Sequence, residues 1–234
     1  MSEHRHPQTG QPVGPPVDDK PAAHPSPVTL QGRYGRIEKL KDGHAASLWQ
    51  AVKDHERLWT YMPSYGPFAD GAAFADWVAA RAALADPYSY AIIDTQGRAL
   101  GIFALMAIRP DHRVVEIGQI VYAPALQRTA LATEAQFLLA RYVFETLRHR
   151  RYEWKCDALN AASRRAAQRY GFSFEGIFRQ HMIGRGYNRD TAWYSMLDGE
   201  WPARKANFER WLNPDNFTAR GKQIESLSGL NATE

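Results

Sequence analysis

Two hydrophobic patterns recur along this chain. Apolar runs rich in Val, Ile, Leu and aromatic residues, typical of buried strands, occupy residues 28–40, 88–94, 99–109, 113–122, 151–157, 174–183 and 191–197. Apolar residues at helical spacing predict helices over 45–53, from Asp70 to about residue 85, from a start within 127–132, and after Asn160. We therefore expect a mixed α/β (α+β) fold, with a mostly antiparallel central sheet of about seven strands flanked by about four helices.

The first 27 residues hold many Pro, His and Gly residues and almost no large apolar ones. Because such a composition cannot form a core, residues 1–27 are expected to be a disordered leader before a domain over 28–200. His4, His6 and His24 are irregularly spaced and lack cysteine partners, which favours solvated histidines over metal ligands. No metal site is expected.

Residues 201–234 are expected to form a C-terminal helix and tail. The sequence WPARKANFERWL places Pro202 at a helix start and Phe208, Trp211 and Leu212 on one face. That apolar face would pack either on the domain or on a second subunit. In the second case the chain would be a homodimer.

The segment 114–147 combines a strand, a short loop and a long helix. Pro124 ends the strand because it cannot donate to a sheet, and the helical pattern starts within QRTALA, residues 127–132. A helix start exposes unpaired N–H groups and a partial positive charge, which suit a phosphate group. Arg128 adds a full charge and Thr129 a hydroxyl. Since many strand-loop-helix units bind nothing, a plain connector remains the alternative.

A second helix start follows the strand at 151–157. In NAASRRAAQRYGF, Asn160 is placed as the helix cap and Gly171 as the C-terminal stop. Asn160 and Ser163 lie one turn apart at the helix start, where both could bond a polar chain laid along it.

Together these motifs resemble the GNAT superfamily of acyl-CoA-dependent N-acyltransferases, and especially its RimJ/RimL-like branch, which includes ribosomal-protein N-terminal acetyltransferases. The likeness runs from about residue 29 to about residue 197 and implies acetyl-CoA as co-substrate. By this resemblance, pantetheine pairs with the backbone of Ile120, Val121 and Tyr122, the pyrophosphate lies against Gln127, Arg128, Thr129, Ala130, Leu131 and Ala132, and Asn160 and Ser163 border the pantetheine arm.

The chain departs from the family pattern at two positions. Ala130 replaces the usual first loop glycine, so a Cβ stands where the backbone approaches phosphate or takes a positive φ. Many GNAT enzymes also use a tyrosine four residues before the terminal glycine as the acid for the departing thiolate. Here that position is Ala167, and Tyr170 faces elsewhere on the helix, which leaves Ser163 or solvent as the acid.

Glu116 is the candidate general base, because an amine must lose a proton to attack a thioester. By the two-residue strand period it shares a face with Gly118, Ile120 and Tyr122. Its place before the loop also resembles the strand glutamate that some GNAT enzymes use as base. The alternative is a structural glutamate paired with Arg109 or Arg113 at a strand edge, and the sequence leaves both open.

An aromatic segment, WTYMPSYGPF, joins the first two predicted helices. It carries Trp59, Tyr61, Tyr65 and Phe68, in the region where this superfamily usually forms its acceptor site. Aromatic side chains on a rigid loop suit a recognition pocket. They suit a plug that closes the core equally well, and we weigh both. The polar segment GRGYNRDT, residues 184–191, is expected to be a hairpin turn.

Composition excludes or disfavours several classes of protein. The formal net charge is +4, but Lys and Arg are spread among acidic residues, so nucleic acid is an unfavoured partner. The single cysteine, Cys156, excludes an internal disulfide framework. No apolar run reaches the roughly 18 residues of a membrane span, and a cytoplasmic protein is expected.

The function expected from the sequence is acetyl-CoA-dependent transfer of an acetyl group to a primary amine, on a peptide N-terminus or a small molecule. The first alternative is a catalytically silent acyl-CoA-binding regulatory module, which Ala130 and the missing tyrosine favour. The second is an RNA-associated basic protein, which steeply salt-dependent binding would support.

Overall fold

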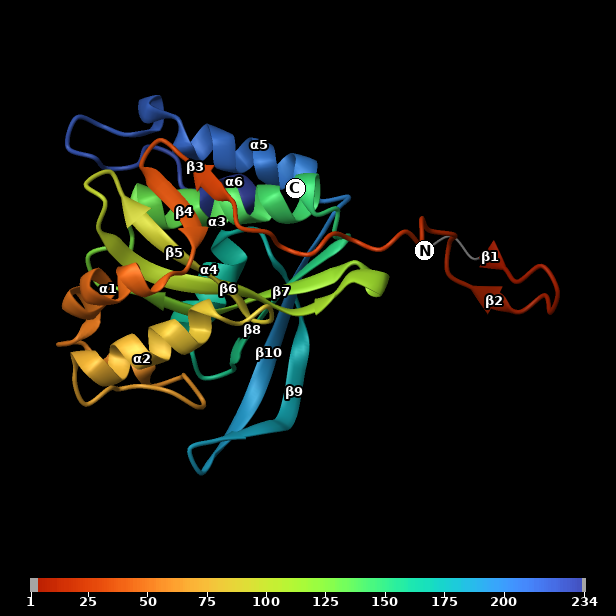
Figure 1. Cartoon of the computed structure of the whole chain (residues 1–234). Helices are drawn as coiled ribbons and strands as arrows, with labels where there is room; N and C mark the ends of the chain where they lie inside the picture. Colours follow the sequence, from red (N-terminus) through yellow and green to blue (C-terminus); the bar gives the residue numbers. More distant parts are fainter. Residues whose placement is uncertain (1–3, 233–234) are drawn as a thin grey trace.

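The computed structural model describes residues 4–232 and builds the domain on one sheet of eight strands (Figure 1). The strand order is β3-β4-β5-β6-β7-β8-β10-β9, and all neighbours are antiparallel except β7 and β8. The bounds are β3 Thr29–Gln31, β4 Gly35–Lys39, β5 Tyr88–Asp94, β6 Ala99–Arg109, β7 Val114–Tyr122, β8 Arg151–Asp157, β9 Ser173–Gly184 and β10 Tyr187–Leu197. The mixed, mostly antiparallel sheet predicted from the sequence is confirmed.

Helices cover both faces of the sheet. They are α1 Ala45–Val52, α2 Gly71–Ala82, α3 Ala130–Arg141, α4 Ala161–Arg169, α5 Trp201–Leu212 and α6 Leu227–Ala232, with a π-helical turn, Tyr142–Thr146, extending α3. Helices α1 and α2 pack on one face, whereas α3, α4, α5 and α6 contribute to the core on the other (Figure 1). No helix within residues 4–232 is long and apolar enough to cross a membrane.

The two cores explain the continuous apolar strands in the middle of the sheet. In β5, Tyr90 and Ile92 point into the α3 core, while Ala91 and Ile93 point into the α1–α2 core. Every residue of β5 is buried for this reason. Strands covered on both faces lose the alternation of apolar and polar residues that a half-exposed strand shows.

The region 28–40 was expected to be one strand, and this is wrong: it is a hairpin of β3 and β4. The carboxylate of Glu134, on α3, accepts hydrogen bonds from the turn N–H groups of Arg33 (2.6 Å) and Tyr34 (2.7 Å). Gly32 leaves room for this carboxylate, since a Cβ there would lie 2.3 Å from it. A turn held by a distant helix leaves no local signal in the sequence.

The C-terminal helix packs within the chain, as one of the two alternatives proposed. Phe208 of α5 lies 5.6 Å, between ring centroids, from Phe137 of α3, and Trp201 lies 6.1 Å from the same ring. Phe208 is 1% exposed. Helix α3 is therefore enclosed between the sheet and α5, which fixes the position of its N-terminus.

The leader contacts the domain near its end. The described part begins with a hairpin of β1 (His4–Arg5) and β2 (Pro12–Val13) that extends away from the body (Figure 1). Further along, the N–H groups of Ala22 and Ala23 donate to the carbonyls of Pro110 and Leu147, and the Ser26 N–H donates to the Tyr142 hydroxyl. These are mostly backbone contacts, which composition does not reveal. Disorder of the leader stays a prediction, and residues 1–3 lie outside the described residues.

Two truncations separate the parts of the leader. Removing residues 1–17 is expected to leave the free energy of unfolding unchanged, because no core residue is lost. Removing residues 1–27 is expected to lower it by about 1–3 kcal/mol, at about 1 kcal/mol for each lost hydrogen bond. Urea unfolding of both variants measures the difference. Equal stability of the two would show that residues 18–27 contribute nothing, as their composition alone suggests.

Candidate active site

The loop before α3 has the geometry of an anion site. Arg128 takes a left-handed backbone conformation, with φ of 63°, and its side chain is exposed. Thr129 caps the helix, its Oγ1 accepting from the Ala132 N–H at 3.1 Å. Ala130 and Leu131 follow in the first turn, where N–H groups precede any intrahelical acceptor. Backbone donors, the positive end of α3 and one guanidinium therefore gather at one place.

The departure at Ala130 has a structural explanation. Ala130 is the first residue of α3, and the positive φ of the loop falls at Arg128 instead. A Cβ at position 130 therefore costs no backbone strain. The loop reaches its turn with an arginine in the conformation that glycine would favour.

Strand β7 offers an unpaired backbone edge beside this loop. Its parallel pairing with β8 ends at Ile117 opposite Trp154, so residues 118–122 have no strand partner on that side among the described residues. Gln127 partly occupies this edge, since its Nε2 donates to the Tyr122 carbonyl at 2.9 Å. Ile120 and Tyr122 pack against the α3 core, whereas Val121 belongs to the α1–α2 core.

Asn160 and Ser163 lie at the start of α4, across from this edge. The Asn160 Oδ1 accepts from the Ser163 N–H at 3.1 Å, which confirms Asn160 as the helix cap. The Ser163 Oγ accepts from the indole N–H of Trp154, the last β8 residue paired with β7, at 3.0 Å. Ser163 is thus fixed at the point where β7 and β8 separate.

No tyrosine of α4 replaces the acid at position 167. Ala167 is fully buried in the α3 core, and Tyr170 is 7% exposed and stacks on Phe208, with ring centroids 6.2 Å apart. The sequence interpretation that Tyr170 faces away from the site agrees with this packing. Ser163 is the α4 residue whose side chain bonds Trp154, where the two strands separate.

A bulge in β7 changes which residues share a sheet face with Glu116. Ile102 and Ala104 are two residues apart on β6. Their partners on β7, Val121 and Gly118, are three residues apart. Gln119 takes a left-handed conformation there, with φ of 53°. The extra residue reverses the alternation, so the prediction that Glu116 shares a face with Ile120 and Tyr122 is wrong. Glu116 faces the α1–α2 side, with Val121.

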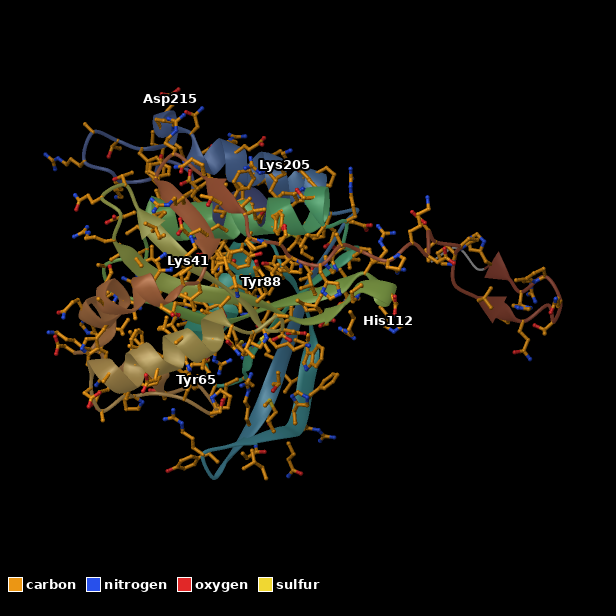
Figure 2. The ribbon with its side chains drawn as sticks, in the orientation of Figure 1. Lys41, Tyr65, Tyr88, His112, Lys205 and Asp215 are labelled. Carbon is orange, nitrogen blue, oxygen red and sulfur yellow. The ribbon has the colours of Figure 1, made fainter. Side chains whose placement is uncertain are left out.

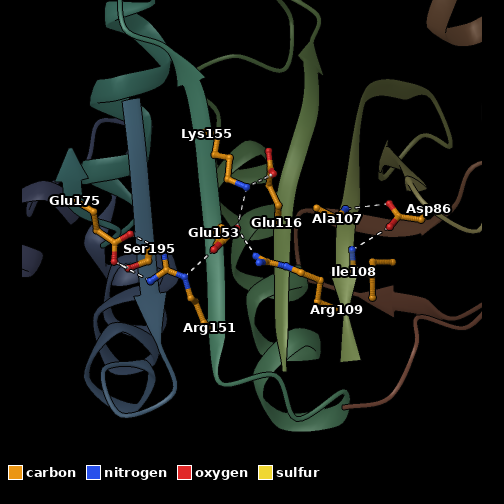
Figure 3. A network of polar contacts seen from close by, with 10 residues as sticks. All are labelled: Asp86, Ala107, Ile108, Arg109, Glu116, Arg151, Glu153, Lys155, Glu175 and Ser195. Atoms are coloured by element: carbon orange, nitrogen blue, oxygen red, sulfur yellow. Dashed lines mark hydrogen bonds and ion pairs between the residues drawn. The ribbon is translucent and has the colours of Figure 1, made fainter. Parts of the chain in front are cut away.

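Glu116 belongs to a buried polar network on that side of the sheet (Figure 3). Its Oε2 lies 2.9 Å from the Nζ of Lys155, which also lies 2.9 Å from Glu153. Arg109, one of the partners proposed for Glu116, instead bonds Glu153 at 3.0 Å, and Arg151 bonds Glu153 at 2.8 Å. The structural alternative therefore had the wrong partner, because Glu116 lies in the part of β7 that is paired with strands on both sides.

Burial raises the pKa of Glu116 above the ordinary glutamate value, although the Lys155 ammonium acts in the opposite direction. The residue is 8% exposed. Its Oε1 forms no hydrogen bond within residues 4–232, whereas Oε2 is held by Lys155. A carboxylate with one oxygen fixed and one available, and with a raised pKa, fits a general base.

The aromatic segment divides into a plug and an exposed rim. Trp59 is 3% exposed, and its ring centroid lies 5.3 Å from that of Phe68 and 6.3 Å from that of Tyr65. Burial raises the pKa of Tyr65 to about 12. Tyr61 is 40% exposed, and its hydroxyl donates to the Leu159 carbonyl at 3.3 Å, just before α4. Only Tyr61 faces outward toward the other side of the site.

The β9–β10 hairpin reaches this segment. The hairpin turn expected over 184–191 is shorter than predicted, because β9 ends at Gly184 and β10 begins at Tyr187. The guanidinium of Arg185, in this turn, donates to the backbone carbonyls of Tyr65 and Gly66. On β7, the side chain of Gln119 accepts from Arg81 of α2 at 3.0 Å. Sequence reasoning missed Lys155 and Arg81 as site residues, because each depends on strand register or long-range packing that no motif records.

A surface hollow of about 790 Å³ adjoins the loop before α3. Pro124 and Gln127 form one side of it, and residues 53–58 form the other. Lys53 and Arg57 balance Asp54 and Glu56 in number there, so the hollow is polar and has no excess of charge. It extends the polar surface beside the start of α3.

Comparison with known proteins gives the family. Residues 36–173 match the model of the acetyltransferase (GNAT) domain. A GCN5-related N-acetyltransferase from Brucella melitensis is 45% identical, with a TM-score of 0.88 over 91% of this chain and 98% of that one. The chain belongs to the GNAT acetyltransferase domain family.

Two proteins with ribosomal names are also similar to this chain. The candidate ribosomal N-acetyltransferase YdaF of Bacillus subtilis is 30% identical over 109 residues, which are 47% of this chain and 59% of that protein. This chain therefore spans less than two thirds of the length of YdaF. The ribosomal L7/L12 α-N-protein acetyltransferase RimL is 20% identical, with a TM-score of 0.65 over 73% of this chain and 94% of RimL, a likeness of fold alone.

Proposed function

We propose that this chain is an acetyl-CoA-dependent N-acetyltransferase that moves the acetyl group directly to a primary amine. The observation that carries the proposal is the unpaired edge of β7, residues 118–122, which leads into the capped start of α3. An extended amide chain can pair with such an edge while its pyrophosphate lies at the helix N-terminus.

The residues at this place fit acetyl-CoA. Ile120, Val121 and Tyr122 would pair with the pantetheine amides, and Gln127 to Ala132 would hold the pyrophosphate, with Arg128 supplying the charge. Asn160 and Ser163 would border the pantetheine arm from α4. When bound, acetyl-CoA supplies the acetyl group as an activated thioester.

Two side chains are proposed to move protons. The Oε1 of Glu116 accepts the proton that the amine loses, because Oε2 is already held by Lys155. Ser163 is proposed to protonate the leaving thiolate. Trp154 donates to the Ser163 Oγ, so the hydroxyl hydrogen of Ser163 is not used in that bond.

The acceptor is proposed to be the amine of a peptide N-terminus or of a small molecule. The names of YdaF and RimL favour the N-terminus of a ribosomal protein. Tyr61 is the exposed aromatic of the acceptor side and is proposed to contact the acceptor, while Trp59, Tyr65 and Phe68 shape the wall behind it.

Coenzyme A is expected to stabilise the folded chain. At about 100 times its dissociation constant, it should raise the free energy of unfolding by roughly 2.7 kcal/mol. Pantetheine, which lacks the pyrophosphate, should bind far more weakly and produce no comparable rise. Thermal unfolding with each ligand measures this. A melting temperature unmoved by saturating coenzyme A would refute the proposed site.

Arg128→Gln is expected to weaken coenzyme A binding mainly at low salt, because screening reduces an exposed charge contact. Arg148→Gln is the matched control. Arg148 is also an exposed arginine with φ of 63°, but it lies in the turn between α3 and β8. Calorimetric titration at two salt concentrations compares the variants. Equal affinities for the two would remove Arg128 from the phosphate site.

A further inference from the structure

The position of Lys155 follows from the register of the sheet. Glu116 of β7 stands opposite Glu153 of β8, so Lys155, two residues further along β8, projects from the same face. Its cross-strand neighbour on β10 is Trp193, and the Lys155 Nζ lies 3.9 Å from the centroid of that ring. The Lys155 side chain is only 13% exposed. This ammonium is therefore held among two carboxylates and an aromatic face.

The two carboxylates depend on Lys155 unequally. Glu153 has Arg109 at 3.0 Å and Arg151 at 2.8 Å as further cationic partners, so its charge is balanced without Lys155. Glu116 forms an ion pair with Lys155 alone among the residues that the structure describes. The guanidinium of Arg189, on β10, lowers the pKa of Glu116 only from longer range. The Glu153 carboxylate raises that pKa, because the two negative charges repel each other.

We propose that Lys155 is a positioning residue for Glu116. It keeps the buried carboxylate ionised and fixes Oε2, so that Oε1 is left to accept the proton of the acceptor amine. Glu153 and Trp193 hold Lys155 in this place. The proton that leaves the amine nitrogen goes to the Glu116 carboxylate and from there to water. This inference rests on the proposed function.

The charges around Glu116 predict how the pH dependence of the rate changes when Lys155 is removed. Burial already raises the pKa of Glu116, and the Lys155 ammonium opposes that rise. Without the ammonium, Glu116 holds its proton up to a higher pH and cannot act as base until that pH is passed. The acidic limb of the rate profile should therefore move upward, whereas activity on its alkaline side should recover.

Lys155→Met is the test. The acidic limb of the kcat/KM profile is expected to move up by about 1–3 pH units, the usual effect of one close opposite charge. Lys155→Arg should restore most of the wild-type profile, because it keeps the charge. The KM for acetyl-CoA should stay unchanged. Lys205→Met is the control. Lys205 lies on α5, and its Nζ is 2.8 Å from the Glu145 carboxylate. Lys205 is on the opposite side of the molecule from Tyr65 (Figure 2).

A second measurement does not require turnover. Carboxyl-labelled NMR titration of Glu116 in the wild type and in Lys155→Met should show a higher pKa in the variant. If Lys155→Met does not fold, Lys155→Gln is titrated instead. An unmoved Glu116 pKa would overturn the positioning role. Absence of turnover in the wild type, with the pKa shift present, would overturn the proposed function and leave the charge coupling standing.

Discussion

Glu116→Gln is expected to reduce turnover by roughly 100- to 10,000-fold, the usual contribution of a general base. The amide keeps the size of the side chain and can still accept from Lys155, but it cannot take a proton. Acetyl-CoA affinity should barely change, because pantetheine is proposed to pair with the backbone of residues 120–122, whereas the Glu116 side chain is held by Lys155. Steady-state kinetics together with coenzyme A titration measure both effects.

Glu145→Gln is the matched control, since Glu145 is also paired with a lysine but lies beside α5. It should leave turnover unchanged. The wild-type acidic limb should disappear in Glu116→Gln if the carboxylate is the titrating base. Near-normal turnover of Glu116→Gln on a verified acceptor would remove Glu116 from the mechanism and leave a water chain, or an amine of low pKa, to explain deprotonation.

Trp59→Ala is expected to lower the free energy of unfolding by about 3–5 kcal/mol, as for large aromatic residues in cores. Trp59 is 3% exposed, and its ring lies edge-on to Phe68 and to Trp77, with centroids 5.3 and 6.2 Å away. Gly66 fits against it, where a Cβ would lie 2.4 Å from the indole. Denaturant unfolding measures the loss.

Tyr61→Phe is the contrasting variant in the same segment. Because Tyr61 is 40% exposed and its hydroxyl makes one long bond, stability should change by less than about 0.5 kcal/mol. The KM for the acceptor should rise, while the KM for acetyl-CoA stays constant. If Trp59→Ala were fully stable and only raised the acceptor KM, Trp59 would line a pocket and would not be part of a plug.

Local signals in the sequence located much of the fold and of the candidate coenzyme site. Asp70, Thr129 and Asn160 lie at helix starts, and each caps its helix through its own side chain. Capping depends on residues three positions apart, so a single sequence contains the information. For the same reason the loop before α3 could be recognised before its geometry was known. The residues of that loop as ligands of the coenzyme stay predictions.

Strand register and long-range packing explain the features that the sequence did not predict correctly. The bulge at Gln119 follows from the pairing of β7 with β6, and it reversed the face expected for Ile120 and Tyr122 relative to Glu116. Lys155 became the partner of Glu116 only because β7 and β8 are parallel neighbours in register. Two-residue alternation holds only while a strand has no inserted residue. A single sequence does not specify which strand pairs with which.

The most direct test is amine-dependent release of coenzyme A from acetyl-CoA. The chain would be incubated with acetyl-CoA and a panel of peptides with free N-termini and small primary amines, with thiol release followed and acetylated products identified by mass spectrometry. We expect release that requires a particular amine, with one acetylated product for each thiol. Tight binding of acetyl-CoA without release by any amine of the panel would contradict the proposed enzyme and indicate a silent acyl-CoA-binding module.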